Sequence, residues 1–248
     1  MLGIIGGSGL DQIRDFQLTQ QRHVPTPYGE PSAPLSCGRL DGREWVFLPR
    51  HGSEHSIAPH RINYRANIWA LQAQGVRRIV SIAAVGGITA ALVPGTLVVP
   101  DQLIDYTHGR ESTFLDGIDK PLAHIDFTSP FSPILRQRLL QAAHAANEIM
   151  CDGGTYGVTQ GPRLETAAEI DRLDRDGATM VGMTGMPEAV LARELELDYA
   201  MLAVVVNAAA GRGGSTQGIA IDEINAVAAA AMVRVLKILS NLEPEDGD

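Results

Sequence analysis

Short apolar runs alternate with amphipathic stretches along nearly the whole chain. Runs of consecutive apolar residues, such as Ala200–Val206, are typical of strands buried on both faces of a sheet. The pattern predicts strands at residues 2–5, 44–48, 78–85, 95–100, 155–159, 178–183 and 200–206. Between them, apolar spacing and helix start and stop signals predict helices over 61–74, 133–148, about 165–177, from Pro187 onward, and 222–239. We therefore expect an α/β fold around a mostly parallel central sheet.

A single domain fits this pattern, because no repeat or low-complexity linker interrupts it. We expect the domain to occupy residues 1–242 and residues 243–248 to form a disordered tail. Residues 105–131 carry little periodicity, and loops of that length are usually functional or lie at an interface. His124 lies within this segment, although most surface histidines have no specific role.

Several predicted strand ends carry groups that suit an anion. In α/β sheets, ligands bind outside the carboxyl ends of the strands. The glycine-rich loop after the first strand could direct backbone N–H groups and the Ser8 hydroxyl at an anion, although a tight turn explains it equally well. Arg50 has a planar donor group suited to phosphate, but it could also pair with a carboxylate. The candidate anion-binding residues are Ser8, Arg50, His51, Ala83, Ala84 and Thr184.

Two further polar residues stand at strand or helix ends. Asn207 follows the apolar run 200–206, so its amide could donate and accept hydrogen bonds at the mouth of a cleft, or it could simply begin a turn. Glu165 stands at the predicted start of the 165–177 helix. There a carboxylate also interacts favourably with the helix dipole, which needs no ligand.

Charge and cysteine content exclude several classes of protein. The net charge is −9 and no block of Lys or Arg occurs, which argues against a nucleic-acid or membrane-surface partner. The two cysteines form no C-x-x-C pair or His/Cys cluster, so neither a zinc site nor a disulfide framework is expected. Position 12 is Gln where a dinucleotide fingerprint starting at Gly7 would need glycine. Because the N-terminus lacks signal-peptide features, we expect a cytoplasmic protein.

Six motifs occur in order along the chain and resemble one family. They are I-G-G-S-G-L (5–10), T-P-Y-G-E-P-S (26–32), R-H-G-x-x-H (50–55), N-Y-R-A-N-I-W-A-L (63–71), G-P-R-L-E-T (161–166) and M-T-G-M-P-E (183–188). Together they resemble the trimeric purine nucleoside phosphorylase/methylthioadenosine phosphorylase family over residues 2–240. The resemblance implies a single-domain α/β sandwich whose mixed central sheet is partly closed into a distorted barrel and flanked by helices. It also implies a homotrimer.

The resemblance implies a reaction as well: phosphorolysis of a purine N-glycosidic bond, giving the free base and a sugar 1-phosphate. Inorganic phosphate is then a co-substrate, and no metal or other cofactor is implied. Phosphate would lie against the anion-binding residues named above, and Met183 would contact the ribose. Leu164 replaces a family phenylalanine that packs on the purine. His124 corresponds to a residue that reaches a neighbouring subunit's site. The remaining expected substrate-binding residues are Glu165, Asn207, Ala208, Ala209, Ile219, Ile221 and Ile224.

Departures from the family pattern bear on the purine base. Members that act on adenine nucleosides resemble this chain except that they carry two aspartates where it has Asn207 and Ala209. An amide can donate to O6 of a 6-oxopurine and accept from its N7–H, whereas Glu165 can accept from N1–H. A site built for one hydrogen-bond pattern rejects the other, because mismatched buried groups stay unpaired. A 6-oxopurine base is therefore expected, with Asn207 assisting its departure.

The sugar end departs in a different way. Family members that bind a 5′-hydroxyl use a histidine near the last helix, but residues 213–232 contain none. Ile219, Ile221 and Ile224 instead offer an apolar wall suited to a 5′-methylthio group. The two ends together predict S-methyl-5′-thioinosine as substrate. The alternatives are S-methyl-5′-thioadenosine, inosine or guanosine, or a nucleoside-binding protein without catalysis.

Overall fold

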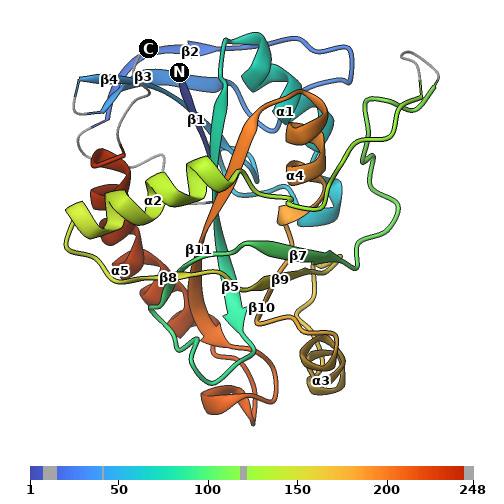
Figure 1. Ribbon diagram of the computed structural model, residues 1–248, viewed down its shortest axis with the longest axis vertical. Coiled ribbons are helices and arrows are strands. Elements are labelled where there is room, and N and C mark those ends of the chain that lie inside the picture. The colour runs from blue at the N-terminus through green and yellow to red at the C-terminus, as the bar shows by residue number, and fades with distance from the viewer. Residues whose placement is uncertain (8–15, 41, 118–121, 243–248) are drawn as a thin grey trace.

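The computed structural model describes residues 1–7, 16–40, 42–117 and 122–242 (Figure 1). The Ser8 hydroxyl and the predicted tail at 243–248 lie outside these described residues. One mixed sheet of eleven strands runs through the molecule. Its strands are β1 (Leu2–Gly6), β2 (Gln17–Arg22), β3 (Leu35–Leu40), β4 (Arg43–Pro49), β5 (Arg78–Gly87), β6 (Leu97–Val99), β7 (Gln102–Asp105), β8 (Met150–Asp152), β9 (Thr155–Val158), β10 (Met180–Gly182) and β11 (Asp198–Ala208).

The sheet is organised around β5. One path of neighbours runs β2-β3-β4-β1-β5-β10-β9-β7, and β11 pairs with both β5 and β6, which in turn pairs with β8. β1 and β11 lie parallel to β5, whereas β10 is antiparallel to it. β5 and β11 are apolar almost throughout because both of their faces are covered. Because β5 and β11 are parallel and paired along their length, their carboxyl ends lie side by side.

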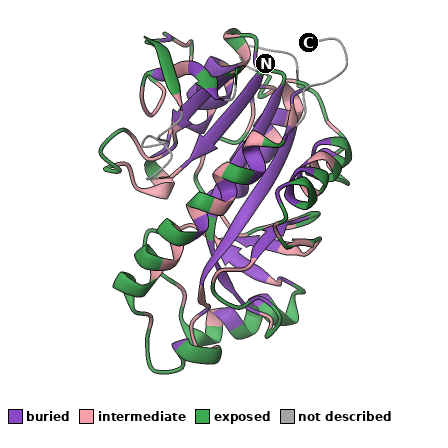
Figure 2. Ribbon diagram, turned by 90° about the vertical axis from the view of Figure 1, so that its left-hand side faces the viewer, coloured by how far each residue is buried: buried purple, intermediate pink, exposed green. Residues whose placement is uncertain are grey.

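Helices cover both faces of the sheet. They are α1 (Tyr64–Ala73), α2 (Pro133–Ala145), α3 (Ala167–Arg175), α4 (Gly185–Glu194) and α5 (Ile221–Ser240). Side chains of β5 alternate between the two faces, so Ile79 and Val85 pack in one core with α1 and α4, whereas Val80 and Ile82 pack in the other with α2 and α5. Figure 2 shows the buried strands between these exposed helical surfaces. Among the described residues, no helix is long and apolar enough to cross a membrane.

This arrangement confirms the predicted α/β class with a mixed central sheet flanked by helices. Several element boundaries were wrong. The helix predicted over 61–74 begins at Tyr64, because the Asn63 side chain caps it by accepting from the Ala66 N–H. The helix after Glu165 begins at Ala167 with a Thr166/Glu169 capping box, which places Glu165 before the helix rather than in its first turn.

Two other boundaries also differ, and four strands were not predicted. Pro187 is not a regular first helical residue, since both it and Met186 have non-helical backbone angles within α4. The strand predicted at 200–206 extends through Asn207 to Ala208, with a register shift between Val205 and Asn207. The pattern did not predict β2, β3, β7 or β8. β2 is exposed at all six positions and therefore carries no apolar alternation.

Candidate active site

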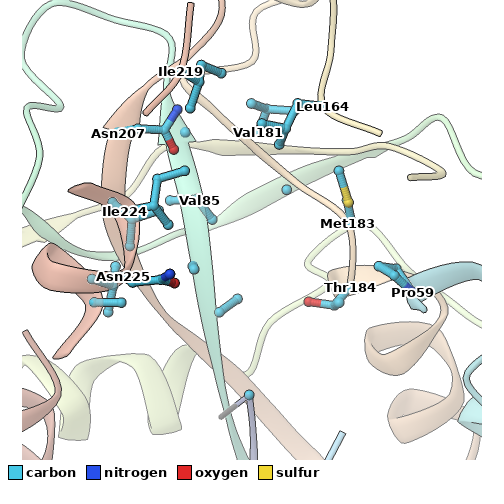
Figure 3. A pocket seen from close by; sticks show the side chains of 18 of the residues that line it. Pro59, Val85, Leu164, Val181, Met183, Thr184, Asn207, Ile219, Ile224 and Asn225 are labelled. Carbon is cyan, nitrogen blue, oxygen red and sulfur yellow. The ribbon is translucent and has the colours of Figure 1, made fainter. Parts of the chain in front are cut away.

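A cavity of about 350 Å³ opens where the carboxyl ends of β5 and β11 meet β10 and the starts of α4 and α5. This size suits a small-molecule ligand. Figure 3 shows side chains from these separate elements facing one space. The structure brings most of the sequence-predicted residues together here, namely Arg50, His51, Ala83, Ala84, Leu164, Glu165, Met183, Thr184, Asn207, Ala209, Ile219 and Ile224. Gly7, beside the undescribed Ser8, lines it too.

Three predicted residues do not line this cavity. Ile221, the first residue of α5, is 56% exposed because the helix begins with this side chain facing outward. Ala208 follows Asn207 in β11, where alternation turns it to the other face of the strand. His124 is exposed in the irregular segment before α2, away from the cavity lining of its own chain. The expectation of an isoleucine wall therefore holds for Ile219 and Ile224 but not for Ile221.

Asn207 stands at the bulge of β11 rather than after the strand. Its Nδ2 donates to the carbonyl oxygen of Ala208 at 2.6 Å, which fixes the orientation of the amide. The oxygen points into the cavity, as Figure 3 shows. One N–H of the Nδ2 group and the Oδ1 acceptor are left for a ligand.

Glu165 is positioned by the end of the neighbouring strand. The Thr159 hydroxyl donates to Oε1 of Glu165 at 2.6 Å and also lies 3.3 Å from the carbonyl of Gly182. One carboxylate oxygen is thereby held and the other stays available as an acceptor. Glu165, from the loop before α3, thus offers an acceptor to the cavity, and Asn207, from β11, offers a donor and an acceptor to the same cavity.

Arg50 is only 2% exposed, and its guanidinium is already engaged. Nε and Nη2 donate to the two carboxylate oxygens of Glu188, which is fully buried, and Nη1 donates to the carbonyl of Ile82 at 3.0 Å. Ser81 and Tyr199 hydroxyls each donate to Glu188 at 2.9 Å. Burial opposes the charge on Arg50, but the adjacent carboxylate raises its pKa. The alternative of an arginine paired with a carboxylate is confirmed.

His51 and Thr184 supply further polar groups beside Arg50. Nδ1 of His51 lies 2.8 Å from the carbonyl of Ile57, so a neutral ring donates through Nδ1. Burial, together with the nearby Arg50, lowers the pKa of His51 to about 4. The Thr184 hydroxyl makes no cap bond to α4, and Figure 3 shows its oxygen directed into the cavity. This end of the cavity therefore offers hydroxyl and backbone groups beside a neutralised ion pair.

An apolar wall closes the side of the cavity next to α5. It is formed by Val204 and Val206 of β11 with Ile224, Ala228 and Met232 of α5. The last three recur every four residues, so they lie along one stripe of the helix. Sequence reasoning missed the place of Ala228 and Met232 at the cavity.

Sequence reasoning also missed Asn225, whose amide enters the cavity beside Ile224. The sequence signal that could have identified Asn225 is a polar residue directly beside the predicted apolar stripe of the last helix. Such a residue more often belongs to the solvent-exposed face of a helix. Within the described ranges, no three His, Cys, Asp or Glu side chains are grouped so as to hold a metal ion.

Comparisons with known proteins place the chain in one family. The family model described as Phosphorylase superfamily matches residues 1–242. A probable S-methyl-5′-thioinosine phosphorylase of Xylella fastidiosa is 50% identical over 98% of both chains. A 6-oxopurine nucleoside phosphorylase of Pyrococcus furiosus is 47% identical over 86% of this chain and 81% of its own.

Solved structures give the same result. Methylthioadenosine phosphorylase from Schistosoma mansoni in complex with adenine matches 97% of this chain and 90% of its own, at 35% identity and a TM-score of 0.91. A methylthioadenosine phosphorylase sourced from an antarctic soil metagenomic library matches with the same TM-score, at 36% identity over 97% of this chain and 84% of its own. With a family model and close relatives that span nearly its full length, the chain belongs to the phosphorylase superfamily.

Proposed function

We propose that this protein catalyses phosphorolysis of S-methyl-5′-thioinosine to hypoxanthine and 5-methylthioribose 1-phosphate, a purine salvage reaction. One observation carries the proposal: a single cavity combines the Asn207 and Glu165 polar edge with an apolar wall that includes Ile219 and Ile224. The first suits a 6-oxopurine and the second a thioether. Relatives named probable S-methyl-5′-thioinosine phosphorylase, about 50% identical, support it.

The base would bind at the polar edge. Oδ1 of Asn207 accepts N7–H of hypoxanthine, and the N–H not used by Ala208 donates to O6. The free oxygen of Glu165 accepts N1–H. Leu164 and Val181 supply apolar contacts to the purine, and Met183 contacts the ribose.

The reaction would proceed without a covalent enzyme intermediate. Phosphate binds beneath C1′, near Thr184 and the backbone at Ala83 and Ala84, with Ser8 as a further donor. The C1′–N9 bond breaks as an oxocarbenium-like sugar develops, and a phosphate oxygen then forms the new bond to C1′. The purine carries away the electron pair of the broken bond and takes up at N7, through water, the proton that phosphate loses. The amide N–H of Asn207 stabilises the developing charge at O6, and its Oδ1 accepts from the new N7–H. Inorganic phosphate is the co-substrate, and we propose no cofactor.

Arg50 and His51 take modified roles in this proposal. Because Glu188 already neutralises Arg50, the arginine would contribute a positioned N–H group rather than an uncompensated positive charge. His51 would be neutral at physiological pH, with Nδ1 held by Ile57. Phosphate would therefore be held largely by neutral donors.

We also propose that the sheet closes partly into a distorted barrel. β6 continues through Pro100 and Asp101 into β7, and β8 continues through Gly153 and Gly154 into β9. The two bent segments stay joined at the bend, where Gly153 N–H donates to Val99 at 2.9 Å and Asp101 N–H to Gly154 at 3.2 Å. Since β6 pairs with β11 and β9 with β10, this bent ribbon would connect both branches that leave β5.

A four-substrate assay tests the proposed function. The protein is incubated with phosphate and each of S-methyl-5′-thioinosine, S-methyl-5′-thioadenosine, inosine and guanosine, and release of the base is measured. We expect the highest kcat/KM for methylthioinosine and no cleavage when phosphate is omitted. Faster turnover of methylthioadenosine would contradict the assignment of Asn207. Binding without cleavage under any condition would indicate a nucleoside-binding protein.

Methylthioadenosine phosphorolysis is the second candidate function. Its support is the likeness to methylthioadenosine phosphorylases of known structure, at 35–36% identity over 97% of this chain. The amide at position 207 counts against it, because an aspartate accepts a hydrogen bond from the 6-amino group or a protonated N7 on both of its oxygens, whereas Asn207 has a single acceptor.

A further inference from the structure

The Asn225 amide is the one polar side chain on the cavity-facing side of α5 in the part of the chain that the structure describes. It stands among Ile224, Ala228 and Met232, all of which line the cavity. Figure 3 shows its amide end directed into the cavity, below Ile224 and apart from Asn207. The described residues give this amide no hydrogen-bond partner, and Asn225 is exposed.

A 5′-methylthio group does not account for this amide. A thioether sulfur is a weak acceptor and donates nothing. If a methylthio group filled the space beside Asn225, the amide would lose water without gaining a partner, which is unfavourable. The surrounding wall is otherwise apolar, so a leucine or valine at this position would serve a thioether better.

The position of Asn225 relates it to the sugar rather than to the base. The base edge is formed by Glu165 and Asn207, and in Figure 3 Ile224 separates Asn207 from Asn225. Ile224 belongs to the wall that the proposed function assigns to the 5′ substituent. An adjacent amide on the same helix turn therefore faces the same end of the nucleoside.

We propose that Asn225 hydrogen-bonds the 5′-hydroxyl of an ordinary nucleoside, so that this cavity takes inosine as a second substrate besides the methylthio compound. The inference rests on the proposed function and names Asn225 as the residue that sets 5′ specificity. The amide can accept from the hydroxyl and donate to it, whereas the neighbouring apolar side chains contact the thioether. Asn225 thereby replaces the histidine absent from residues 213–232.

The test compares two substrates that differ only at the 5′ position. kcat/KM is measured for inosine and for methylthioinosine with the wild type, Asn225→Leu and the control Ala226→Leu. Leucine is close to asparagine in size, and Ala226 is an exposed α5 residue outside the cavity. We expect Asn225→Leu to lower the inosine-to-methylthioinosine ratio about 10-fold, as for one hydrogen bond, and Ala226→Leu to leave it unchanged.

Several results would overturn the inference. A proportional change for both substrates would indicate a structural role, and an unchanged ratio would show that the amide does not contact the 5′ group. A rise confined to the KM for phosphate would place Asn225 at the anion end instead. The ratio of the two nucleosides' dissociation constants, measured without phosphate by calorimetry, gives the same comparison independently of turnover. Absence of phosphorolysis with both nucleosides would refute the proposed function, while the binding ratio would still decide the role of Asn225.

Discussion

At the scale of single residues, the polar groups at the base edge are each held by one hydrogen bond and left with another free. Asn207 is held through Ala208, and Glu165 through Thr159. The direction of the first bond matters most, because it requires a donor at the Nδ2 position. An aspartate would bring a carboxylate oxygen against the Ala208 carbonyl, and two acceptors at that distance repel each other.

The first prediction concerns Asn207→Asp. We expect the ratio of kcat/KM for methylthioadenosine to that for methylthioinosine to rise at least about 10-fold, because a carboxylate accepts from a 6-amino group but repels O6. Total activity falls as well, since the acid loses its bond to Ala208. The exposed Asn147→Asp is the matched control and leaves both rates unchanged. Equal loss on both nucleosides would contradict this reading of the base edge.

His51 gives a pH prediction. Its folded-state pKa is about 4, below the ordinary value near 6.5, because burial disfavours the charged ring. As the pH falls below 6.5, the unfolded chain takes up the proton first, so the stability that His51 contributes is complete above pH 6.5 and declines toward pH 4. The variant His51→Gln has no such group, so its stability lacks this loss. The Tm of the wild type should therefore fall relative to that of the variant as the pH is lowered from 6.5 to 4. A Tm difference that stays constant over this range would contradict the prediction.

The site residues differ in how far the sequence could predict them. Arg50, Thr184 and Asn207 stand at strand or helix ends, so the apolar pattern and the motifs place them at one sheet edge. The pairing of Arg50 with Glu188 joins residues 138 positions apart, and no local pattern carries that information. Asn225 was missed because helical periodicity assigns a polar residue beside an apolar stripe to the solvent-exposed face. Here that border of the helix faces a cavity, where a polar side chain can contact a ligand.

At the scale of elements, the long apolar strands and amphipathic helices were predicted and the edge strands were not. β5 and β11 are continuous apolar runs, which local reading detects. β2 is exposed throughout, and β8 has three residues, none of them fully buried. These two segments are strands because β2 pairs with β3 and β8 pairs with β6, and their own composition does not indicate it. The register shift at Asn207 is likewise a property of two paired strands.

The buried network behind the anion end joins four elements. Arg50 follows β4, Ser81 lies in β5, Glu188 in α4 and Tyr199 in β11. We predict that Glu188→Gln lowers the free energy of unfolding by roughly 3–5 kcal/mol, because it leaves the Arg50 charge buried without its partner. Chemical denaturation measures this, with the exposed Glu54→Gln as control. A loss no larger than that of the control would mean that the ion pair contributes nothing to holding these elements together.

At the scale of the whole molecule, the described residues 106–117 and 122–132 do not line the cavity of their own chain. Residues 106–117 lie against α1 and α4, where Arg110 donates to the Tyr64 hydroxyl and to the carbonyl oxygen of Met186. His124, in the second of these stretches, is exposed. In the homotrimer that the family resemblance implies, we propose that the residues around His124 reach the cavity of the neighbouring subunit, so that each site combines residues of two chains.

Mixing two impaired variants, assayed at a nucleoside concentration below KM, tests this arrangement. Asn207→Ala removes the amide from a subunit's own site, with an expected loss of roughly 10²–10³ in kcat, as for one oxyanion donor. His124→Ala removes the contribution that a subunit makes to its neighbour and should raise the KM for nucleoside.

The two variants are then co-expressed with different tags, and mixed oligomers are purified. In these oligomers a site is intact if its own chain carries Asn207 and its neighbour carries His124. In a trimer that contains both variants, about one site in three is intact, so activity should exceed that of either variant alone. If His124 acted within its own chain or not at all, no site in the mixture would gain activity, and the rate would equal the average of the two separate variants.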